Sequence, residues 1–379
     1  MSRLLFVSSV TDGGSGRSQR ELAAALIDAG RDVRILASPT GTTRAPRRVR
    51  LMVAGAGISG TGTQRPLAAL RRRLGTSIDR RELDGVPYDL TPVPEVAFET
   101  VTSARRPDAV IVSSIERHAW RSIRAACRRR GIPTALHLRE PTAIGHLSAG
   151  LRPDLLLANS GTLVEDAARL GHHATLVPSV VTAVPMDRPP TGEVLLMINP
   201  VASHGVDLVG PIAAARPDIP IVLQESRALS RGERDTVERI VARHPNVTSR
   251  AFDPRRELVF RDARVLLAPH RVDNRPRTVL EAQANGIPVV SSDRPGLVES
   301  AGDGGVIVAE RAGADAWIRA VGALWDDEGV WMAASDRARI HAGRPDVRPA
   351  RVAERFGELI DELVDAGQNN SMSPSENRN

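Results

Sequence analysis

Short apolar runs alternate with amphipathic helical stretches along most of this chain. Residues 3–10 (RLLFVSSV) and 107–114 (PDAVIVSS) are two such runs, and the stretch 20–30 (RELAAALIDAG) is helical and ends at a glycine. Apolar runs of this length are typical of strands buried on both faces, and their alternation with helices predicts a parallel sheet in an α/β fold. Further strands are predicted at residues 32–38, 132–140, 153–160, 193–200, 220–226, 263–269 and 286–292.

A proline-rich segment at 182–192 (TAVPMDRPPTG) interrupts the alternation, which restarts after it. Such a segment is typical of a linker between domains. The sequence therefore predicts two Rossmann-like domains, a last helix and a polar, disordered tail. Their predicted ranges are 1–185, 186–350, 351–367 and 368–379.

The net charge of +6 over 379 residues favours an anionic partner. Phosphorylated substrates, nucleic acid and an acidic membrane all qualify, and a basic surface that only faces solvent fits equally well. Aromatic residues make up 3% of the chain, too few for the stacking platforms of single-strand binders, so no nucleic acid partner is expected. All 51 basic residues are arginine, which rules out a lysine Schiff base and a Walker A lysine.

Cys127 is the one cysteine of the chain, which fits a reducing compartment, and no apolar run of about 18 residues exists. We therefore expect a cytoplasmic protein. The stretch 65–75 (RPLAALRRRLG) predicts a short basic amphipathic helix. This helix either touches the inner face of an anionic membrane or simply faces solvent.

The segment 273–300 (DNRPRTVLEAQANGIPVVSSDRPGLVES) carries the clearest chemistry. Asp273, Arg275 and Arg277 precede or open a predicted helix, and Glu281 lies further along it. The backbone amides and the dipole at a helix N-terminus attract anions. A carboxylate one turn further along can accept the two hydroxyls of a ribose. The segment therefore predicts a binding site for a sugar nucleotide.

Two other strand ends carry candidate residues. GGSG at residues 13–16 is predicted as a loop between the first strand and the first helix, where glycines let a phosphate or sugar approach the backbone. A plain turn is the alternative. HLRE at residues 137–140 ends a predicted strand, where ligands of doubly wound sheets bind. A salt-bridged strand end is the alternative there.

Other chemistries have weaker support. Residues 55–60 (GAGISG, with Gly55, Gly57 and Gly60) fit the dinucleotide fingerprint, but they lie beyond the opening βαβ unit, and Pro66 would interrupt the helix that must follow. A nicotinamide-dependent oxidoreductase is thus an alternative that cofactor binding would reveal. The nine histidines are scattered, so no metal site is expected.

Three segments together resemble the GT-B glycosyltransferases, specifically the retaining family 4, or glycosyl transferases group 1. They are residues 263–300, with an acidic pair and an EA-x-A-x-G-x-PVV run, residues 159–171 (NSGTLVEDAARLG) and residues 199–208 (NPVASHGVDL). The opening GGSG and the two-domain alternation fit the same family. The resemblance covers about residues 1–365.

The resemblance implies a GT-B fold, an α/β architecture of two Rossmann-like domains facing each other across a cleft. The first domain would hold the acceptor and the second the donor, and the last helix would cross back to the first domain. The implied activity is metal-independent, retaining transfer of a sugar from a nucleotide-diphosphate sugar to an acceptor hydroxyl, with no cofactor besides the donor. The acceptor stays open between a small molecule, a glycan and a lipid-linked molecule.

The resemblance also implies site residues. Asp273, Arg139 and Glu140 would lie at the reacting sugar, and Glu281 would hold the ribose. The amides of Thr278 and Val279 would face the diphosphate. The remaining donor-binding residues implied are Gly13, Gly14, Gly16, Asn199, His204, Phe252, Asp253, Arg275 and Arg277.

Three departures from the family pattern affect the donor site. Asp273 replaces a glutamate, Asn199 and His204 replace the arginine and lysine that neutralise the diphosphate, and Pro276 replaces a glycine. These changes weaken stabilisation of the leaving group, usually the largest catalytic contribution. Arg275 and Arg277 are the candidates to compensate. The alternative is a catalytically impaired GT-B protein that binds a nucleotide sugar or partners another transferase.

Overall fold

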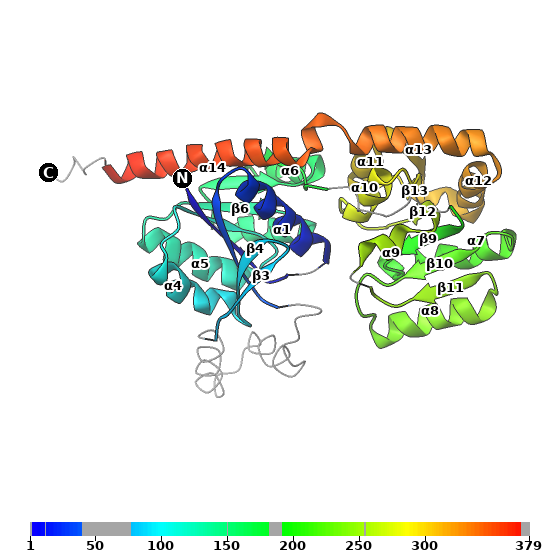
Figure 1. Cartoon of the computed structure of the whole chain (residues 1–379), viewed down its shortest axis with the longest axis horizontal. Helices are drawn as coiled ribbons and strands as arrows, with labels where there is room; N and C mark the ends of the chain where they lie inside the picture. The colour runs from blue at the N-terminus through cyan, green and yellow to red at the C-terminus, as the bar shows by residue number, and fades with distance from the viewer. Residues whose placement is uncertain are drawn as a thin grey trace. The chain divides into compact units, whose positions relative to one another are not determined.

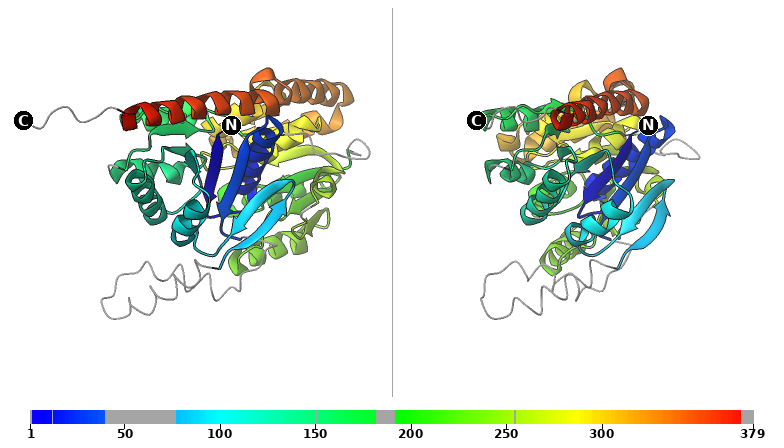
Figure 2. Two further views of the ribbon diagram at one scale, coloured as in Figure 1. Left: turned by 60° about the vertical axis from the view of Figure 1, so that its left-hand side comes forward. Right: turned by 90° about the vertical axis from the view of Figure 1, so that its left-hand side faces the viewer.

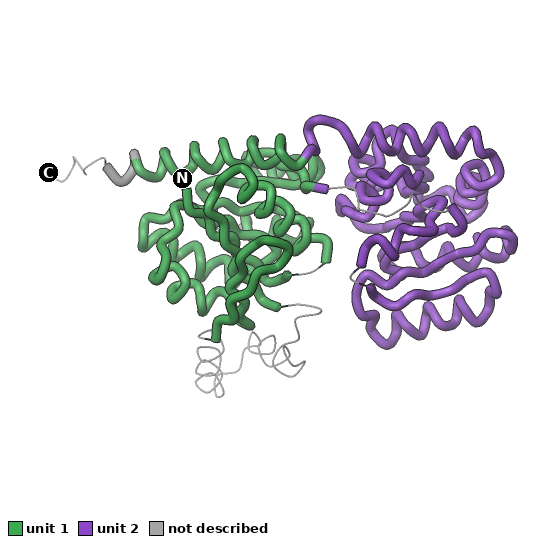
Figure 3. Tube along the Cα trace, in the orientation of Figure 1, with its two compact units in different colours: residues 1–180, 349–379 green, residues 181–348 purple. Residues whose placement is uncertain are grey.

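The computed structural model describes residues 2–39 apart from Asp12, residues 77–181 apart from Gly150, and residues 192–372 apart from Pro254. The chain divides into two compact units, which Figure 3 colours separately. Unit 1 contains residues 1–180 and 349–379, and unit 2 contains residues 181–348. The predicted basic helix, the GAGISG segment and nearly all of the predicted linker lie outside the described residues.

Unit 1 is built on one eight-stranded sheet in the order β3-β4-β2-β1-β5-β6-β7-β8 (Figure 1). All neighbouring strands pair in parallel except β3 and β4, which form an antiparallel edge hairpin. The strands are β1 (Arg3–Ser8), β2 (Asp32–Ala37), β3 (Asp79–Leu83), β4 (Val86–Leu90), β5 (Ala109–Val112), β6 (Thr134–Leu138), β7 (Leu155–Ala158) and β8 (Thr175–Leu176).

Helices cover both faces of this sheet. Helices α1 (Gly13–Asp28) and α14 (Pro349–Met372) pack together on one face, where Phe356 of α14 stacks on Phe6 of β1 with ring centroids 5.8 Å apart. Figure 2 shows α14 running along this unit. The other face buries the apolar sides of α4, α5 and α6. Their bounds are Pro94–Ala104, Arg117–Arg129 and Gly161–Arg169, and a 3-10 segment, η1, spans Pro141–Ala149.

Unit 2 is built on a six-stranded, all-parallel sheet in the order β11-β10-β9-β12-β13-β14. Its strands are β9 (Val194–Ile198), β10 (Ile221–Gln224), β11 (Val247–Arg250), β12 (Ala263–Ala268), β13 (Val289–Ser292) and β14 (Gly305–Val308). One face packs against α7 (Val209–Ala215), α8 (Arg231–Arg243), α12 (Gly313–Asp326) and α13 (Glu328–Ala342). The other packs against α9 (Arg256–Phe260), α10 (Arg277–Ala284) and α11 (Pro295–Ala301).

The structure confirms the predicted α/β fold with two mostly parallel sheets. It differs at the GGSG segment, predicted as a loop, because Gly13 already begins α1 and the four residues form its first turn. The helix predicted over 351–367 spans Pro349–Met372, so residues 368–372 of the predicted disordered tail are helical. Residues 373–379 lie outside the described part. None of the described helices combines the length and the apolarity that a bilayer crossing needs.

Candidate functional site

In unit 2, three loops meet at the carboxyl ends of the neighbouring strands β9, β12 and β13. Gly205, with φ +75°, lies so close to Pro269 that a Cβ there would overlap the Pro269 carbonyl oxygen. Gly296 is equally close to the backbone of Asn274. The amide of Arg271 donates to the Ser203 carbonyl at 2.9 Å. The loops therefore form one packed edge, at the position where ligands of open α/β sheets bind.

Two histidines stack at this edge. The rings of His204 and His270 lie 3.8 Å apart at an interplanar angle of 16°, and Asn199 Nδ2 lies 3.3 Å from His204 Nδ1. Ser292 Oγ donates to the His270 carbonyl at 2.6 Å. Burial lowers the pKa of His204 and brings that of His270 down to about 3, so both imidazoles are neutral at pH 7.

Buried polar atoms without a hydrogen-bond partner gather at the same edge. Among the described residues, Asn199 Oδ1, Asp273 Oδ1 and Arg294 Nε are such atoms, and each comes from a different loop. Buried polar groups in folded proteins almost always have partners, so a group of exceptions at one strand edge indicates a ligand site.

Asp273 belongs to a chain of charges that the sequence did not reveal. Arg294, which follows β13, lies 3.9 Å from Asp273 and 2.6 Å from Glu310. The Asp273 side chain is 41% exposed, so its carboxylate can reach a ligand. In the sequence, Arg294 is a lone arginine after a predicted strand. Only the strand order of the sheet shows that it lies near Asp273.

Glu281 is held between two arginines on α9 and α10. Arg277, four residues earlier on α10, and Arg256 of α9 each form an ion pair with one Glu281 carboxylate oxygen. The Glu281 side chain is only 4% exposed. The two guanidinium groups fix its orientation, and they also neutralise it.

The other predicted residues of this helix start are also engaged. The Arg275 side chain is buried, 3.4 Å from Glu299, and burial lowers its pKa. The Val279 amide donates to Pro276 O at 3.2 Å, while its side chain is in the core. Thr278 is half-buried. Both arginines expected at the diphosphate are therefore paired with carboxylates of the protein.

Phe252 and Asp253 follow β11, at the same end of the sheet. Phe252 is an exposed aromatic side chain. Asp253 accepts hydrogen bonds from the Arg255 guanidinium at 2.8 and 3.1 Å, and these bonds lower its pKa to about 2. An exposed ring beside a fixed carboxylate provides a stacking surface and a hydrogen-bond acceptor.

The carboxyl edge of the unit 1 sheet brings together three residues. Ser15 in the first turn of α1 donates to Glu140 Oε1 at 3.1 Å, and Ser114 after β5 lies 2.7 Å from Ser15 Oγ and 3.2 Å from Glu140 Oε1. Ser114 has φ +45°, a backbone conformation that costs free energy for a residue other than glycine. Glu140 was predicted for this edge, whereas Ser15 and Ser114 were not.

Arg139 points elsewhere. Its side chain is on the face of β6 that α14 covers, because His137 two residues earlier packs against Phe356 at 6.3 Å. Arg139 Nη2 lies 3.3 Å from His137 Nδ1, and both residues are buried. Burial and the nearby guanidinium lower the His137 pKa well below its usual value. The structure thus brings Glu140, but not Arg139, to the exposed edge.

The glycines of the first turn of α1 have different surroundings. A Cβ on Gly16 would lie 2.5 Å from the carbonyl carbon of Thr11, whereas a Cβ on Gly14 would meet nothing within 4 Å. Gly13 has φ +75°. Gly16 is therefore required for packing, while Gly14 leaves the backbone open to an approaching ligand.

We expect Gly16→Ala to lower the free energy of unfolding by about 1–3 kcal/mol, because the added methyl forces the helix away from the backbone of Thr11. Gly14→Ala is the matched control, since it adds the same methyl in open space and should leave stability within about 0.5 kcal/mol. Chemical denaturation of both variants measures the difference. Equal stabilities would contradict the packing role of Gly16.

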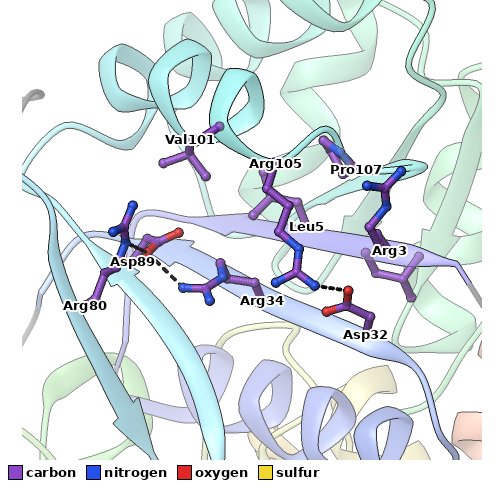
Figure 4. Close-up of a pocket in the computed structure, with 11 residues that line it drawn as sticks. Arg3, Leu5, Asp32, Arg34, Arg80, Asp89, Val101, Arg105 and Pro107 are labelled. Carbon is purple, nitrogen blue, oxygen red and sulfur yellow. Dashed lines mark hydrogen bonds and ion pairs between the residues drawn. The ribbon is translucent and has the colours of Figure 1, made fainter.

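A separate pocket of about 290 Å³ lies in unit 1, where β1 and β2 begin and α4 ends (Figure 4). Arg34 and Arg80 share the carboxylate of Asp89, at 3.0 and 3.4 Å, and Arg105 pairs with Asp32. Leu5 and Val101 provide apolar walls, as the figure shows. This pocket contains none of the predicted site residues. Over the described residues, no group of three or more His, Cys, Asp or Glu could hold a metal ion.

Residues 217–327 match the family model described as glycosyl transferases group 1. The fold resembles that of sucrose-phosphate synthase from Thermosynechococcus elongatus, with 14% identity, a TM-score of 0.75, and coverage of 97% of this chain and 100% of that one. It also resembles Anabaena HepE in complex with UDP and glucose, with 13% identity, a TM-score of 0.69, and coverage of 95% of this chain and 100% of that one. A glycosyltransferase from Rickettsia africae is similar as well, with 11% identity, a TM-score of 0.67, and coverage of 96% of this chain and 99% of that one. No curated protein matches the sequence.

The chain has the fold of the GT-B glycosyltransferases, and residues 217–327 match the model of the glycosyl transferases group 1. The predicted fold is confirmed, and the family match of residues 217–327 supports the predicted glycosyl transfer. The matched segment contains β10 to β14 and α8 to α12, so it includes Asp273, Glu281 and Arg294.

Proposed function

We propose that this protein transfers a sugar from a nucleoside-diphosphate sugar to an acceptor hydroxyl, with retention of the anomeric configuration and without a metal ion. The observation that carries the proposal is the group of unpartnered polar atoms on Asn199, Asp273 and Arg294, at the edge where the loops of unit 2 meet. The relative HepE, whose structure was determined in complex with UDP-glucose, supports this class of donor.

The residues of unit 2 then have distinct roles. Phe252 supplies a stacking surface for the base, and Glu281, oriented by Arg256 and Arg277, accepts the ribose hydroxyls. Asp273 contacts the transferred sugar. As the bond between the anomeric carbon and the diphosphate oxygen breaks, negative charge develops on the diphosphate, and positive groups at this edge stabilise it. Arg294 is the arginine that faces Asp273 there.

In the reaction, the acceptor oxygen bonds to the anomeric carbon on the face from which the diphosphate leaves. The acceptor proton goes to the leaving diphosphate, so atoms and charges balance without a protein base. In unit 1 we assign Gly14 and Glu140 to the substrate side, because the first is open to close approach and the second is exposed at the strand edge. The acceptor is a small molecule, a glycan or a lipid-linked molecule.

One observation favours a second candidate, a protein that binds a nucleotide sugar without turnover. Arg277 pairs with Glu281, and Arg275 lies beside Glu299. The charge of each arginine expected at the diphosphate is therefore balanced by a carboxylate of the protein. If Arg294 and the histidine pair do not replace them, the leaving group lacks stabilisation. The two candidates share a binding site and differ in catalysis.

Calorimetric titration with UDP, GDP, ADP and dTDP, without added metal, tests the site. We expect one diphosphate to bind in clear preference, because the base meets a specific surface at Phe252 and Asp253. Binding of none of the four would overturn the donor site. With the matching nucleotide sugar, release of free diphosphate supports the transferase, and binding without release supports the second candidate. NMR of the product determines whether its anomeric configuration is retained.

A further inference from the structure

The stacked imidazoles of His204 and His270 lie at the proposed donor site and are neutral at rest. We propose that His204 takes up a proton when the diphosphate of the donor binds, and so becomes the cation that stabilises this leaving group. The proposal deepens the proposed function and rests on it. In this arrangement His270 is a positioning residue that covers one face of His204.

The backbone holds the two rings in place. His204 ends the short 3-10 segment η2 (Ala202–His204), and the following Gly205 packs against Pro269, next to His270. The His270 ring is nearly fully buried, whereas His204 is half-buried. His204 is therefore the member of the pair that a ligand can reach.

Without a ligand, the surroundings of His204 and His270 favour the neutral form of both rings. Burial lowers the pKa of both rings, and His204 lowers the pKa of His270 further. Hydrogen bonds to the backbone of Ile198 and Asn199 act in the opposite direction on the pKa of His204, but burial outweighs them. Arg227, after β10, also lowers the pKa of His204. In the described part of the chain, neither ring has a carboxylate partner. An added proton therefore needs a counter-charge that comes with a ligand.

The charged groups of the surrounding elements are already matched with each other. They are Arg227 with Glu233 at 2.7 Å and Glu225 with Arg234 at 3.4 Å beside β10, Asp207 of η3 (Val206–Leu208) with Arg271 at 2.6 Å, and Asp273 with Arg294 and Glu310 beyond β12 and β13. A diphosphate at this edge would bring unmatched negative charge within reach of His204. An opposite charge within about 4–6 Å favours the protonated imidazole.

Asn199 can serve both protonation states of His204. Its Nδ2 lies 3.3 Å from His204 Nδ1 and donates to this nitrogen in the neutral tautomer that is protonated at Nε2, while its Oδ1 is buried without a partner. When Nδ1 carries a proton, a half-turn of the amide presents Oδ1 as the acceptor instead. The unpartnered oxygen is thus an acceptor ready for the charged state, and no other group has to move.

Proton uptake is measured by titrating the protein with UDP, GDP, ADP and dTDP in two buffers of different ionisation enthalpy at pH 8. A terminal phosphate ionises at about pH 6, so it contributes little proton exchange at pH 8. We expect uptake of up to one proton for each diphosphate bound. The protonated state is favoured in the complex, so affinity is highest at low pH. It falls by about tenfold per pH unit between the His204 pKa of the free protein and that of the complex.

Three variants test whether His204 is the group that takes up the proton. His204→Gln should lose both the uptake and the pH dependence that the natural protein shows above pH 7, whereas His270→Phe, which keeps a stacked ring, should retain them. His341→Gln is the matched control, because His341 is a half-buried histidine of unit 2 with a lowered pKa that contacts the Ser300 carbonyl instead. Uptake should be unchanged in this variant.

Diphosphate binding without proton uptake, or equal uptake by the natural protein and His204→Gln, would overturn this inference and leave the proposed function standing. Failure of the natural protein to bind any of the four diphosphates would overturn both. Uptake that His204→Gln removes and His341→Gln preserves would support the inference.

Discussion

Replacing Glu281 with glutamine is expected to lower the free energy of unfolding by about 3–5 kcal/mol and to weaken diphosphate binding strongly. Glutamine keeps the shape of the side chain, so the change removes only the charge. Arg277 and Arg256 would then lie with side chains 6% and 15% exposed and without the carboxylate that both contact. Removing one partner of a buried ion pair leaves a charge that water cannot solvate.

Urea denaturation and calorimetric titration measure the two effects separately. Glu328→Gln is the control in the same unit, because Glu328 contacts Arg264 at 2.8 Å but is 63% exposed. Exposed ion pairs contribute at most about 1 kcal/mol, so this variant should keep its stability and its binding. If Glu281→Gln lost no more stability than the control, the buried ion pairs would not support the site. Unchanged diphosphate binding by Glu281→Gln would contradict the assignment of Glu281 to the ribose hydroxyls.

Replacing Gly205 with alanine is expected to cost about 2–5 kcal/mol of stability. The left-handed backbone contributes about 1–2 kcal/mol, because Gly205 has φ +75°. The forced separation from Pro269 adds about 1–3 kcal/mol. The same movement separates His204 from His270, so diphosphate binding should weaken in parallel.

Gly313→Ala isolates the contribution of the backbone. Gly313 has φ +71°, but a Cβ there meets no atom within 4 Å, so only the left-handed conformation opposes the alanine. We expect this control to lose about 1–2 kcal/mol and to bind diphosphate as the natural protein does. Equal losses in the two variants would show that the contact between the loops at Gly205 is unimportant.

The strands were predictable because most of them are buried on both faces. Short apolar runs such as those of β1, β5 and β9, alternating with amphipathic helices, are typical of such strands. The hairpin of β3 and β4 was not predicted, since β3 is an exposed edge strand whose sequence, DRREL, has no apolar run. The first turn of α1 was taken for a loop because GGSG has no apolar periodicity, and the packing of Gly16 against Thr11 is a tertiary effect.

Only part of the candidate site was predictable. Glu281 and Asp273 were found because they belong to one recognisable segment. His270 and Arg294 of unit 2, like Ser15 and Ser114 of unit 1, were missed because each is a single polar residue in a loop or helix start, and only the strand order of its own sheet brings it to the carboxyl edge of that sheet. The partners of Arg275 and Arg277 could not be foreseen either, because Glu299 and Arg256 approach from other helices.

Helix α14 makes the assembly of unit 1 depend on the order of synthesis. Its side chain Phe356 completes the core around Phe6, yet some 170 residues of unit 2 separate this helix from the rest of unit 1. A nascent chain therefore leaves the ribosome with the part of this apolar face that α14 covers still exposed, while α1 can already pack beside it. Unit 2, which is continuous in sequence, can close first. In that interval the uncovered face is a target for chaperones.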